Sequence, residues 1–424
     1  MSASPPPPAP RRLVLVGDPH GLPTLLDAVP RERVVGLIGA EIRPQHHPAL
    51  EALAAAWKLP LLIQPRATSD RYPAFLNAVA ALAPELFLVY SYSMRLREEL
   101  LALAPAGGLN LHGALLPQYR GASPLQNALL NGERETGATL HVMTPSFDDG
   151  PIVAQSRVPV HFADTWVDVY ERIHASAGPL LAQAMPAILE GRLEARPQDE
   201  REAGYYPRRY PEDGHFEWTQ PCLAIYHLIR ALVRPHPGAF YQRGDDRVTL
   251  DRFLPLGRVV AMKYDPDVGA CKLQGRLVAL APLEDPDDPW QAAHDRFRFA
   301  VAGPATPTGW LGFHHFDPQH RTAAFELNLP AARESSWQEA ARLGLGFAFE
   351  ELALQRVYAR VPAADTALIA RLEAAGFVKE RHLPRAFRPF GIFEEVWVMR
   401  VLRSEFMRQL RQSRLALRPL GAAK

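Results

Sequence analysis

The sequence GGLNLHGALLPQYRGASPLQNALLNGERETGATLHVMTPSFDDGPIVAQ spans residues 107–155. Its beginning is typical of a β-strand on which Asn110 and His112 stand two residues apart. Because side chains on a strand alternate between its two faces, the amide and the imidazole are expected to share one face. Two acids, Asp148 and Asp149, follow on a turn that Gly150 closes. This combination indicates a reactive site rather than a packed core.

Short apolar segments alternate with helical segments on the N-terminal side of this stretch. The predicted strands are 12–16, 34–38, 61–63, 86–90 and 109–112, and the predicted helices are 22–29, 48–57 and 72–82. Such alternation is typical of an α/β domain with a mostly parallel, Rossmann-like sheet that has helices on both faces. Ligands of these sheets bind at the carboxyl ends of the strands, where Asn110 and His112 would lie. The first strand is not followed by Gly-x-Gly-x-x-Gly, which argues against a dinucleotide cofactor.

The C-terminal side of the stretch predicts further domains. Strands at 139–143 and 152–160 and a helix at 166–189 would complete the first domain, and the polar segment 190–204 is interpreted as a linker. A β-rich unit begins at Tyr205, and a second boundary is expected at Asp285–Pro289. A mixed α/β pattern follows. The predicted organisation is a disordered leader at 1–11, a catalytic domain at 12–203, a small β-rich subdomain at 204–275 and a mixed α/β domain at 276–424.

Length and composition restrict the class of protein. With 424 residues, the chain is long enough for two or three domains. Its 47 basic and 46 acidic residues nearly cancel, which does not favour a nucleic-acid surface. Two cysteines, Cys222 and Cys271, are too few for a disulfide framework or a Cys-rich metal site. Without an apolar run that could span a membrane or act as a signal, we expect a cytoplasmic protein without a metal.

The residues of the opening stretch suggest a reaction type. An imidazole held by a carboxylate can take a proton from a nucleophile, and an amide N–H can stabilise an oxyanion at a carbonyl. This is the chemistry of acyl transfer without a covalent enzyme intermediate. A nearby carboxylate is expected to raise the pKa of His112. Arg120 either positions an anionic group or pairs with a neighbouring acid. On its own, one His on an apolar strand is more typical of packing.

Several ordered motifs in this region resemble the formyltransferases that use 10-formyltetrahydrofolate. The similarity covers roughly residues 12–250 and includes Asn110–His112, Leu115–Gly121, Glu135–Gly137 and Asp148–Gly150. It implies a catalytic triad of Asn110, His112 and Asp148, because the family's acid lies two residues before the glycine of the turn. It also implies a folate against the end of strand 86–90. The residues expected to bind this folate are Val89, Met94, Leu115, Leu116, Pro117 and Arg120.

Within this family, the sequence is most similar to the nucleotide-sugar N-formyltransferases, in particular the type that formylates UDP-4-amino-4-deoxy-L-arabinose. The shared segments include Ala104–Gly107, Asn131–Glu133 and Pro237–Phe240. The resemblance implies a small-molecule acceptor whose amine is formylated for a surface glycan. Three alternatives remain open: an enzyme like methionyl-tRNA formyltransferase, a hydrolase of the formyl-folate, and a non-enzymatic sensor of sugar nucleotides or folate.

The last domain resembles the GNAT acyltransferases in segments 343–350, 356–358 and 372–377. This resemblance implies a site for acetyl-CoA, in which a Gly-rich turn presents backbone N–H groups to phosphates. The corresponding segment 332–337 contains no glycine, and Glu334 adds a negative charge. We therefore expect either a degenerate domain that binds substrate or supports a homo-oligomer, or a second centre in a bifunctional formyl- and acetyltransferase.

Overall fold

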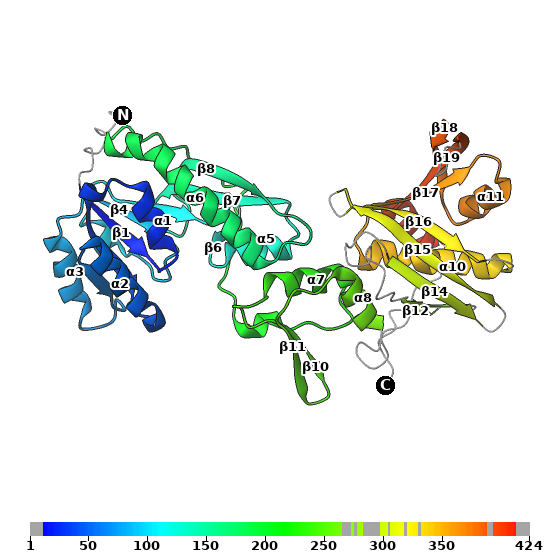
Figure 1. Ribbon diagram of the computed structural model, residues 1–424, viewed down its shortest axis with the longest axis horizontal. Helices are drawn as coiled ribbons and strands as arrows, with labels where there is room; N and C mark the ends of the chain where they lie inside the picture. Colours follow the sequence, from blue (N-terminus) through cyan, green and yellow to red (C-terminus); the bar gives the residue numbers. More distant parts are fainter. Residues whose placement is uncertain are drawn as a thin grey trace. The chain divides into compact units, whose positions relative to one another are not determined.

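The computed structural model describes residues 12–264, 273–274, 278–282, 297–303, 306–317, 320–329, 332–387 and 393–412 (Figure 1). The predicted leader at 1–11, Cys271 and the predicted boundary at Asp285–Pro289 lie outside these residues. The chain divides into two compact units, Met1–Tyr210 and Pro211–Lys424.

The first unit is built on a seven-stranded sheet with the order β3-β2-β1-β4-β5-β7-β8. Its strands are β1 (Leu13–Gly17), β2 (Val34–Ala40), β3 (Leu61–Gln64), β4 (Leu86–Tyr90), β5 (Gly108–His112), β7 (Glu135–Val142) and β8 (Ile152–Pro159). The five strands from β3 to β5 are parallel, whereas β7 is antiparallel to β5 and β8 to β7. The prediction of a mostly parallel α/β sheet is confirmed, with two reversed strands at one edge. A short pair, β6 (Arg120–Gly121) and β9 (Tyr205–Tyr206), lies outside this sheet.

Helices cover both faces of this sheet. They are α1 (Gly21–Ala28), α2 (His47–Trp57), α3 (Tyr72–Ala81), α4 (Glu98–Leu101), α5 (Pro124–Leu130) and α6 (Trp166–Leu189), with short 3-10 turns at η1 (Arg31–Arg33) and η2 (Pro44–His46). Val14 and Val16 share a buried cluster with Phe75 of α3 on one face. On the other face α1 packs against α6, which crosses β7 and β8 (Figure 1).

Local sequence explains the elements that carry the site. All five residues of β4 are buried, as expected for a central parallel strand whose two faces are both covered. Helix α6 begins after Thr165 because the Asp168 carboxylate accepts the Thr165 backbone N–H at 2.8 Å and its hydroxyl at 2.6 Å. These two elements form adjoining walls of the pocket described below.

The second unit contains a mixed sheet with the order β12-β13-β14-β15-β16-β17-β19-β18. Its strands are β12 (Leu273–Gln274), β13 (Ala279–Pro282), β14 (Phe297–Gly303), β15 (Thr306–Asp317), β16 (Thr322–Asn328), β17 (Arg356–Pro362), β18 (Val378–Phe387) and β19 (Phe393–Leu402), and a separate hairpin joins β10 (Ala239–Arg243) to β11 (Asp246–Leu250). Its helices are η3 (Pro211–Gly214), α7 (Cys222–Ala231), α8 (Leu256–Tyr264), α10 (Glu334–Gly346), the π-helical turn η4 (Phe347–Glu351), α11 (Thr366–Ala374) and α12 (Arg403–Gln412). Among the described strands of this sheet, only β16 and β17 pair in parallel.

Two features differ from the sequence-based expectations. The segment 190–204, interpreted as a linker, is instead attached to the first unit: Arg196 bridges to Ile152, and Gln198 binds the carbonyl of Asp148. Strand β18 was not predicted, since its charged, Pro-containing sequence lacks an alternating apolar pattern. In the part of the chain that the structure describes, no helix has the length and apolar character needed to cross a bilayer.

Candidate active site

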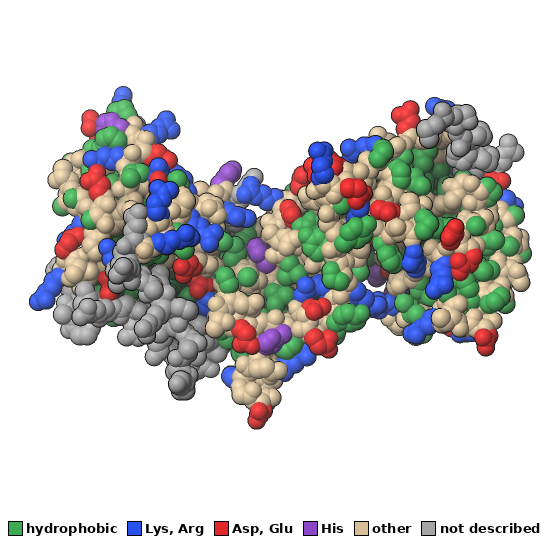
Figure 2. Space-filling model, turned by 180° about the vertical axis from the view of Figure 1, so that it is seen from behind, with side chains coloured by type: hydrophobic (Ala, Val, Ile, Leu, Met, Phe, Trp, Pro, Cys, Tyr) green, Lys and Arg blue, Asp and Glu red, His purple; other side chains and the backbone are tan. Residues whose placement is uncertain are grey.

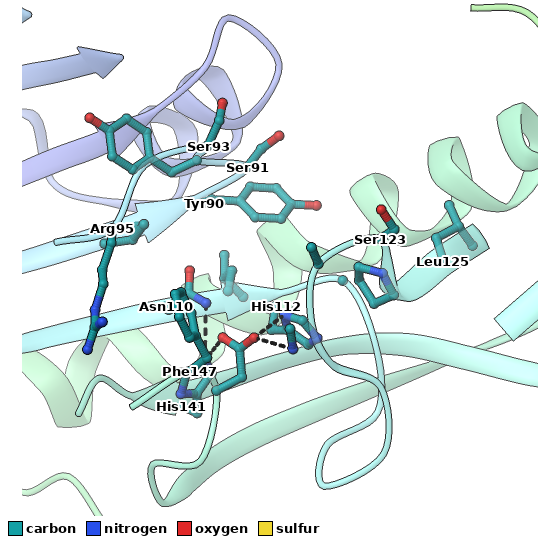
Figure 3. A pocket seen from close by; sticks show the side chains of 18 of the residues that line it. Tyr90, Ser91, Ser93, Arg95, Asn110, His112, Ser123, Leu125, His141 and Phe147 are labelled. Carbon is teal, nitrogen blue, oxygen red and sulfur yellow. Dashed lines mark hydrogen bonds and ion pairs between the residues drawn. The ribbon is translucent and has the colours of Figure 1, made fainter. Parts of the chain in front are cut away.

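Asn110 and His112 lie at the end of β5, beside a pocket of about 560 Å³ (Figure 3). The register of β4 and β5 pairs Val89 with Asn110 and Tyr90 with Leu111. The site therefore forms at the carboxyl ends of two neighbouring parallel strands, which is where such sheets bind ligands. His112 is buried, with 7% of its surface exposed.

The turn between β7 and β8 brings Asp148 to the two histidines of the site. One carboxylate oxygen of Asp148 lies 3.6 Å from Nδ1 of His112, and the other lies 3.5 Å from Nε2 of His141. The backbone N–H of Gly121 donates to this carboxylate at 2.8 Å. Asp149 accepts a hydrogen bond from the Thr144 hydroxyl instead. Of the two acids predicted on this turn, Asp148 is the one placed beside His112.

The hydrogen bonds of His112 define its tautomer. Its Nε2 lies 2.7 Å from the carbonyl oxygen of Tyr119, which can only accept, so Nε2 carries the proton and donates. In the neutral ring, the lone pair is therefore on Nδ1, which faces Asp148. Burial lowers the pKa of His112 more than the charge of Asp148 raises it. The expectation of a raised pKa is thus wrong, because it counted the carboxylate and omitted desolvation.

Asp148 is held in its ionised form. Burial would raise its pKa, but the attraction of His112, the contact with His141 and the hydrogen bond from Gly121 lower the pKa to about 2. At neutral pH the site consequently holds a carboxylate next to a neutral imidazole. A proton that arrives on Nδ1 of His112 would be stabilised by that carboxylate.

His141 is a site residue to which the sequence interpretation gave no role. It lies on β7, which pairs Asn110 with His141. Its Nδ1 lies 2.9 Å from the Val142 carbonyl and donates to it, so Nε2 accepts from the Asn110 side-chain amide at 3.1 Å. This contact orients the Asn110 amide and leaves its second N–H for another acceptor. The signal that could have found His141 was the pairing of the two strands.

Arg120 has a different environment from the one expected of a folate-binding residue. Its guanidinium is 1% exposed and binds Glu200 at 2.7 and 3.0 Å. It also donates to Gln198 at 3.0 Å, and the Gln198 amide donates to the carbonyls of Asp148 and Gly150 at 2.8 and 2.7 Å. Arg120 therefore pairs with a neighbouring acid, the second of the two possibilities raised by the sequence, and supports the turn that carries Asp148.

The remaining residues predicted to bind folate fall into two groups. Val89 and Met94 line the pocket that also contains Asn110, His112 and Asp148. Leu115, Leu116 and Pro117 line a separate cavity of about 210 Å³. The structure therefore brings the first two together with the triad and places the other three apart from it. In Figure 3 Arg95 lies on one side of Asn110 and His112, Ser123 and Leu125 lie on the other, and Tyr90 lies above them.

Further side chains line the pocket without having been predicted to do so. Helix α6 contributes Trp166, Tyr170 and His174, and two cations, Arg43 and Arg208, are also part of the lining. Among the described residues, no cluster of three or more His, Cys, Asp or Glu side chains has an arrangement that could hold a metal ion.

A neutral imidazole, a carboxylate and an oriented amide at the carboxyl edge of an α/β sheet define a site for transfer of an acyl-type group through a carbonyl addition step. Comparison with protein families identifies the class more closely. Residues 35–185 match the family described as formyl transferase, and residues 209–279 match the formyl transferase C-terminal domain. Together the matches span just over half of the chain. The protein belongs to the formyltransferase family.

Solved structures give related matches. Glycinamide ribonucleotide transformylase 1 from Symbiobacterium toebii is 30% identical, with 44% of this chain and 94% of that chain covered and a TM-score of 0.39. An N-formyltransferase from Helicobacter canadensis, solved with folinic acid and dTDP-3-aminofucose, is 18% identical. The match covers 55% of this chain and 84% of that chain, with a TM-score of 0.44. Spermidine/spermine N-acetyltransferase SpeG from Vibrio cholerae is 20% identical. The match covers 31% of this chain and 96% of that chain, with a TM-score of 0.28.

Proposed function

We propose that this formyltransferase moves a formyl group from 10-formyltetrahydrofolate to the amine of a nucleotide-linked amino sugar. The observation that carries the proposal is the meeting of Asn110, His112 and Asp148 at one pocket whose lining also includes Arg43 and Arg208. The three polar groups supply the chemistry, and the two guanidinium groups suit an acceptor that carries a diphosphate.

In the proposed reaction His112 is the general base. The amine nitrogen attacks the formyl carbon, so that a new C–N bond forms and the carbonyl π electrons move to the formyl oxygen. His112 accepts the amine proton at Nδ1, the ring nitrogen left without a proton by the bond to the Tyr119 carbonyl. Asp148, 3.6 Å from Nδ1, stabilises the resulting imidazolium. Collapse of the intermediate breaks the bond to N10 of the folate, and the proton passes to that nitrogen.

Asn110 is assigned to the oxyanion. Its amide donates one hydrogen to His141, and the second is directed to the formyl oxygen as negative charge develops there. A preorganised donor of this kind is worth about 3 kcal/mol of transition-state stabilisation. Because His141 fixes the amide orientation before substrate binds, Asn110 does not have to reorganise during the reaction.

The formyl donor is assigned to the side of the pocket formed by the loop after β4. Val89 and Met94 provide apolar contacts suited to a flat ring, and Arg95 lies over the Phe147 ring with 5.1 Å between the guanidinium carbon and the ring centroid. Leu115, Leu116, Pro117 and Arg120 are not included in this assignment, since they line another cavity or pair with Glu200.

The charge distribution supports a nucleotide sugar over a tRNA acceptor. On the face shown in Figure 2, Lys and Arg side chains are interspersed with Asp and Glu side chains. A tRNA-binding enzyme depends on contacts to many phosphates and is favoured by a continuous basic surface. Three arginines in one pocket, of which Arg43 and Arg208 are assigned to the acceptor, fit the much smaller charge of a sugar nucleotide.

The proposed activity is tested by incubating the purified protein with 10-formyltetrahydrofolate and UDP-4-amino-4-deoxy-L-arabinose. Mass spectrometry should show the acceptor with one added formyl group. His112→Ala should lower kcat at least about a hundredfold, because the general base is lost. Glycinamide ribonucleotide and methionyl-tRNA serve as comparison acceptors. Faster formylation of either one, or full activity of folded His112→Ala, would contradict the proposal.

A second candidate function is favoured by one observation in the second unit. The parallel strands β16 and β17 pair only from Thr322–Arg356 to Ala324–Tyr358, although both strands continue beyond this point. Diverging parallel strands are the opening that the resemblance to GNAT enzymes implies for acetyl-CoA. The residues fit that cofactor incompletely, because α10 begins with Glu334, whose carboxylate would face the phosphates. Calorimetry with acetyl-CoA decides the question, since binding heat is expected only from an intact cofactor site.

A further inference from the structure

Helix α6 presents a row of aromatic side chains to the pocket. Trp166, Tyr170 and His174 follow one another at four-residue spacing, which places them on one helix face. The Trp166 and Tyr170 rings are stacked at 4.6 Å between centroids, and the Tyr170 and His174 rings lie 4.2 Å apart. All three side chains are partly exposed, so the row is a surface of the pocket rather than a part of the core.

The row ends beside the catalytic residues. The His174 ring lies 4.8 Å from the ring of Tyr90, at the end of β4. Tyr90 in turn is paired with Leu111, so its side chain lies on the opposite face of the sheet from Asn110 and His112, and all three side chains line the pocket at the carboxyl edge. Starting from the triad, the aromatic rings therefore follow the order Tyr90, His174, Tyr170 and Trp166. A molecule lying along this row would have one end at the triad.

The Tyr90 hydroxyl is a polar group that a ligand can satisfy. Tyr90 is 3% exposed, and its hydroxyl oxygen is buried with no hydrogen-bond partner among the described residues. Figure 3 shows the ring extending toward the side of the pocket where Ser123 and Leu125 lie. A buried hydroxyl without a partner costs stability, and such groups are often found at functional positions.

The row carries no charge at neutral pH. Burial, followed by the nearby His20, lowers the pKa of His174 to about 4 against the opposing effect of Asp18. Burial raises the pKa of Tyr90 and raises that of Tyr170 to about 12. The faces of uncharged aromatic rings are electron-rich and attract C–H groups. One face of a sugar ring carries such C–H groups, so it can pack against the row. A charged or strongly hydrated group gains less from such a wall.

We propose that Tyr90 and the α6 row form the acceptor subsite, in which the pyranose ring of the amino sugar packs against Tyr90 and His174 with its amine toward His112. This inference rests on the proposed function and names the residues that hold its acceptor. The donor is assigned to the part of the pocket where Arg95 lies, away from Ser123 and Leu125 (Figure 3). The sugar, and not the nucleobase, lies at the Tyr90 end, because the reacting amine belongs to the sugar and must reach the triad.

The test measures binding without turnover. Isothermal titration calorimetry with UDP-4-amino-4-deoxy-L-arabinose is performed on protein saturated with 5-formyltetrahydrofolate, which stands in for the donor. His174→Leu and Tyr90→Phe should each weaken acceptor binding about tenfold, through a lost ring contact and a lost hydrogen bond respectively. The affinity for 5-formyltetrahydrofolate should stay within about twofold of wild type. Tyr90→Phe should retain or raise Tm, because it removes an unsatisfied buried hydroxyl.

Glu171→Ala is the matched control, since Glu171 is on the same helix but is exposed and does not line the pocket. It should bind both ligands like wild type. Unchanged acceptor affinity in both pocket variants, or an equal loss for acceptor and donor, would overturn the subsite. The proposed function is judged separately by turnover of the wild-type enzyme. An active wild type, together with unchanged acceptor affinity in both variants, would contradict the subsite and leave the proposed function standing.

Discussion

Asp148 is held in an uncommon backbone conformation before any substrate binds. Its φ is +54°, in the left-handed region, which costs a non-glycine residue about 1 kcal/mol. The conformation is maintained from two sides: Gln198 binds the Asp148 carbonyl, and Gly121 binds its carboxylate. The carboxylate is thereby positioned next to Nδ1 of His112 in advance. The strained backbone conformation therefore holds the carboxylate in place before substrate binds, which preorganises the site.

The titration of His112 and Asp148 predicts how the enzyme responds to acid. His112 has a folded-state pKa below its usual value of about 6.5, and Asp148 has one of about 2. Both shifts favour the unprotonated group in the folded protein, so both contribute stability that is present at high pH and lost as pH falls. For Asp148, about 2 kcal/mol should be lost between pH 4 and pH 2.

This prediction is checked by urea unfolding of wild type and Asp148→Asn between pH 7 and pH 2. In the variant, the free energy of unfolding should fall less steeply between pH 4 and pH 2, because the contribution of Asp148 is missing. Its kcat should fall at least about a hundredfold at pH 7, because the imidazolium of His112 loses its carboxylate partner. In wild type, kcat/KM should decrease at acidic pH as His112 and the amine become protonated. If the free energy of unfolding depends on pH in the same way in both proteins, the folded state does not hold Asp148 in its ionised form.

The residue-level prediction from sequence depended on period-two alternation. That rule places Asn110 and His112 on one face of a strand, and the structure has both residues at the carboxyl end of β5. His141 could not be assigned in the same way, because its position beside Asn110 depends on the register between β5 and β7. The pKa of His112 was predicted in the wrong direction, since burial depends on all the elements packed around it.

At the level of elements, the segment after α6 supports the turn that carries Asp148. Gln198 joins the Arg120 guanidinium to the carbonyls of Asp148 and Gly150. The turn itself has little room to adjust: a Cβ added to Gly150 would lie 1.8 Å from the carbonyl oxygen of Val142. The position of the Asp148 carboxylate therefore depends on a side chain 50 residues away in sequence.

Gln198→Ala should lower kcat about tenfold or more, with little change in the affinity for 5-formyltetrahydrofolate, because it releases the turn that aims Asp148. The neighbouring Asp199→Ala is the control, as Asp199 pairs with Arg201 at the surface and does not contact the turn. Stopped-flow or steady-state kinetics with calorimetry separate the two effects. A wild-type kcat for Gln198→Ala would exclude this supporting role.

Element boundaries were predicted well where the apolar pattern was strong. Strand 86–90 and helix 166–189 occur with the predicted bounds, because one is a continuous buried run and the other has a long apolar face. The segment 190–204 is polar and gave no such pattern, although its Gln198 side chain binds the turn that carries Asp148. Hydrogen-bonded partners far apart in sequence leave no periodic signal, which explains why Arg120 and Glu200 were not predicted as a pair.

At the level of the whole molecule, the match to the formyltransferase C-terminal domain ends inside the second unit. Residues 209–279 match that domain, whereas the compact unit is Pro211–Lys424. A buried ion pair joins α8 to η4 within this unit: Lys263, 3% exposed, binds Glu351 at 2.7 Å. Glu351 also accepts the Cys222 backbone N–H at 2.9 Å. The matched region is therefore packed against the strands and helices that follow it.

Glu351→Gln should lower the free energy of unfolding of the second unit by about 3 kcal/mol, because Lys263 is left buried without a carboxylate. Glu350→Gln is the control: burial and the adjacent Glu351 raise the pKa of Glu350, so that loss of its charge should be neutral or slightly stabilising. Urea denaturation followed by tryptophan fluorescence measures both. Equal stability of the two variants would show that the ion pair makes no net contribution.

The aromatic row on α6 also bears on how acceptor preference can change during evolution. The residues that carry the proposed chemistry come from β5, β7 and the turn after β7, whereas Trp166, Tyr170 and His174 come from a single helix packed against the sheet. Substitutions on one face of that helix can reshape the pocket and leave those strands unaltered. Under the proposed subsite, substitutions at Trp166, Tyr170 and His174 are expected to change which amine is accepted while the strands that carry Asn110, His112 and His141 stay the same.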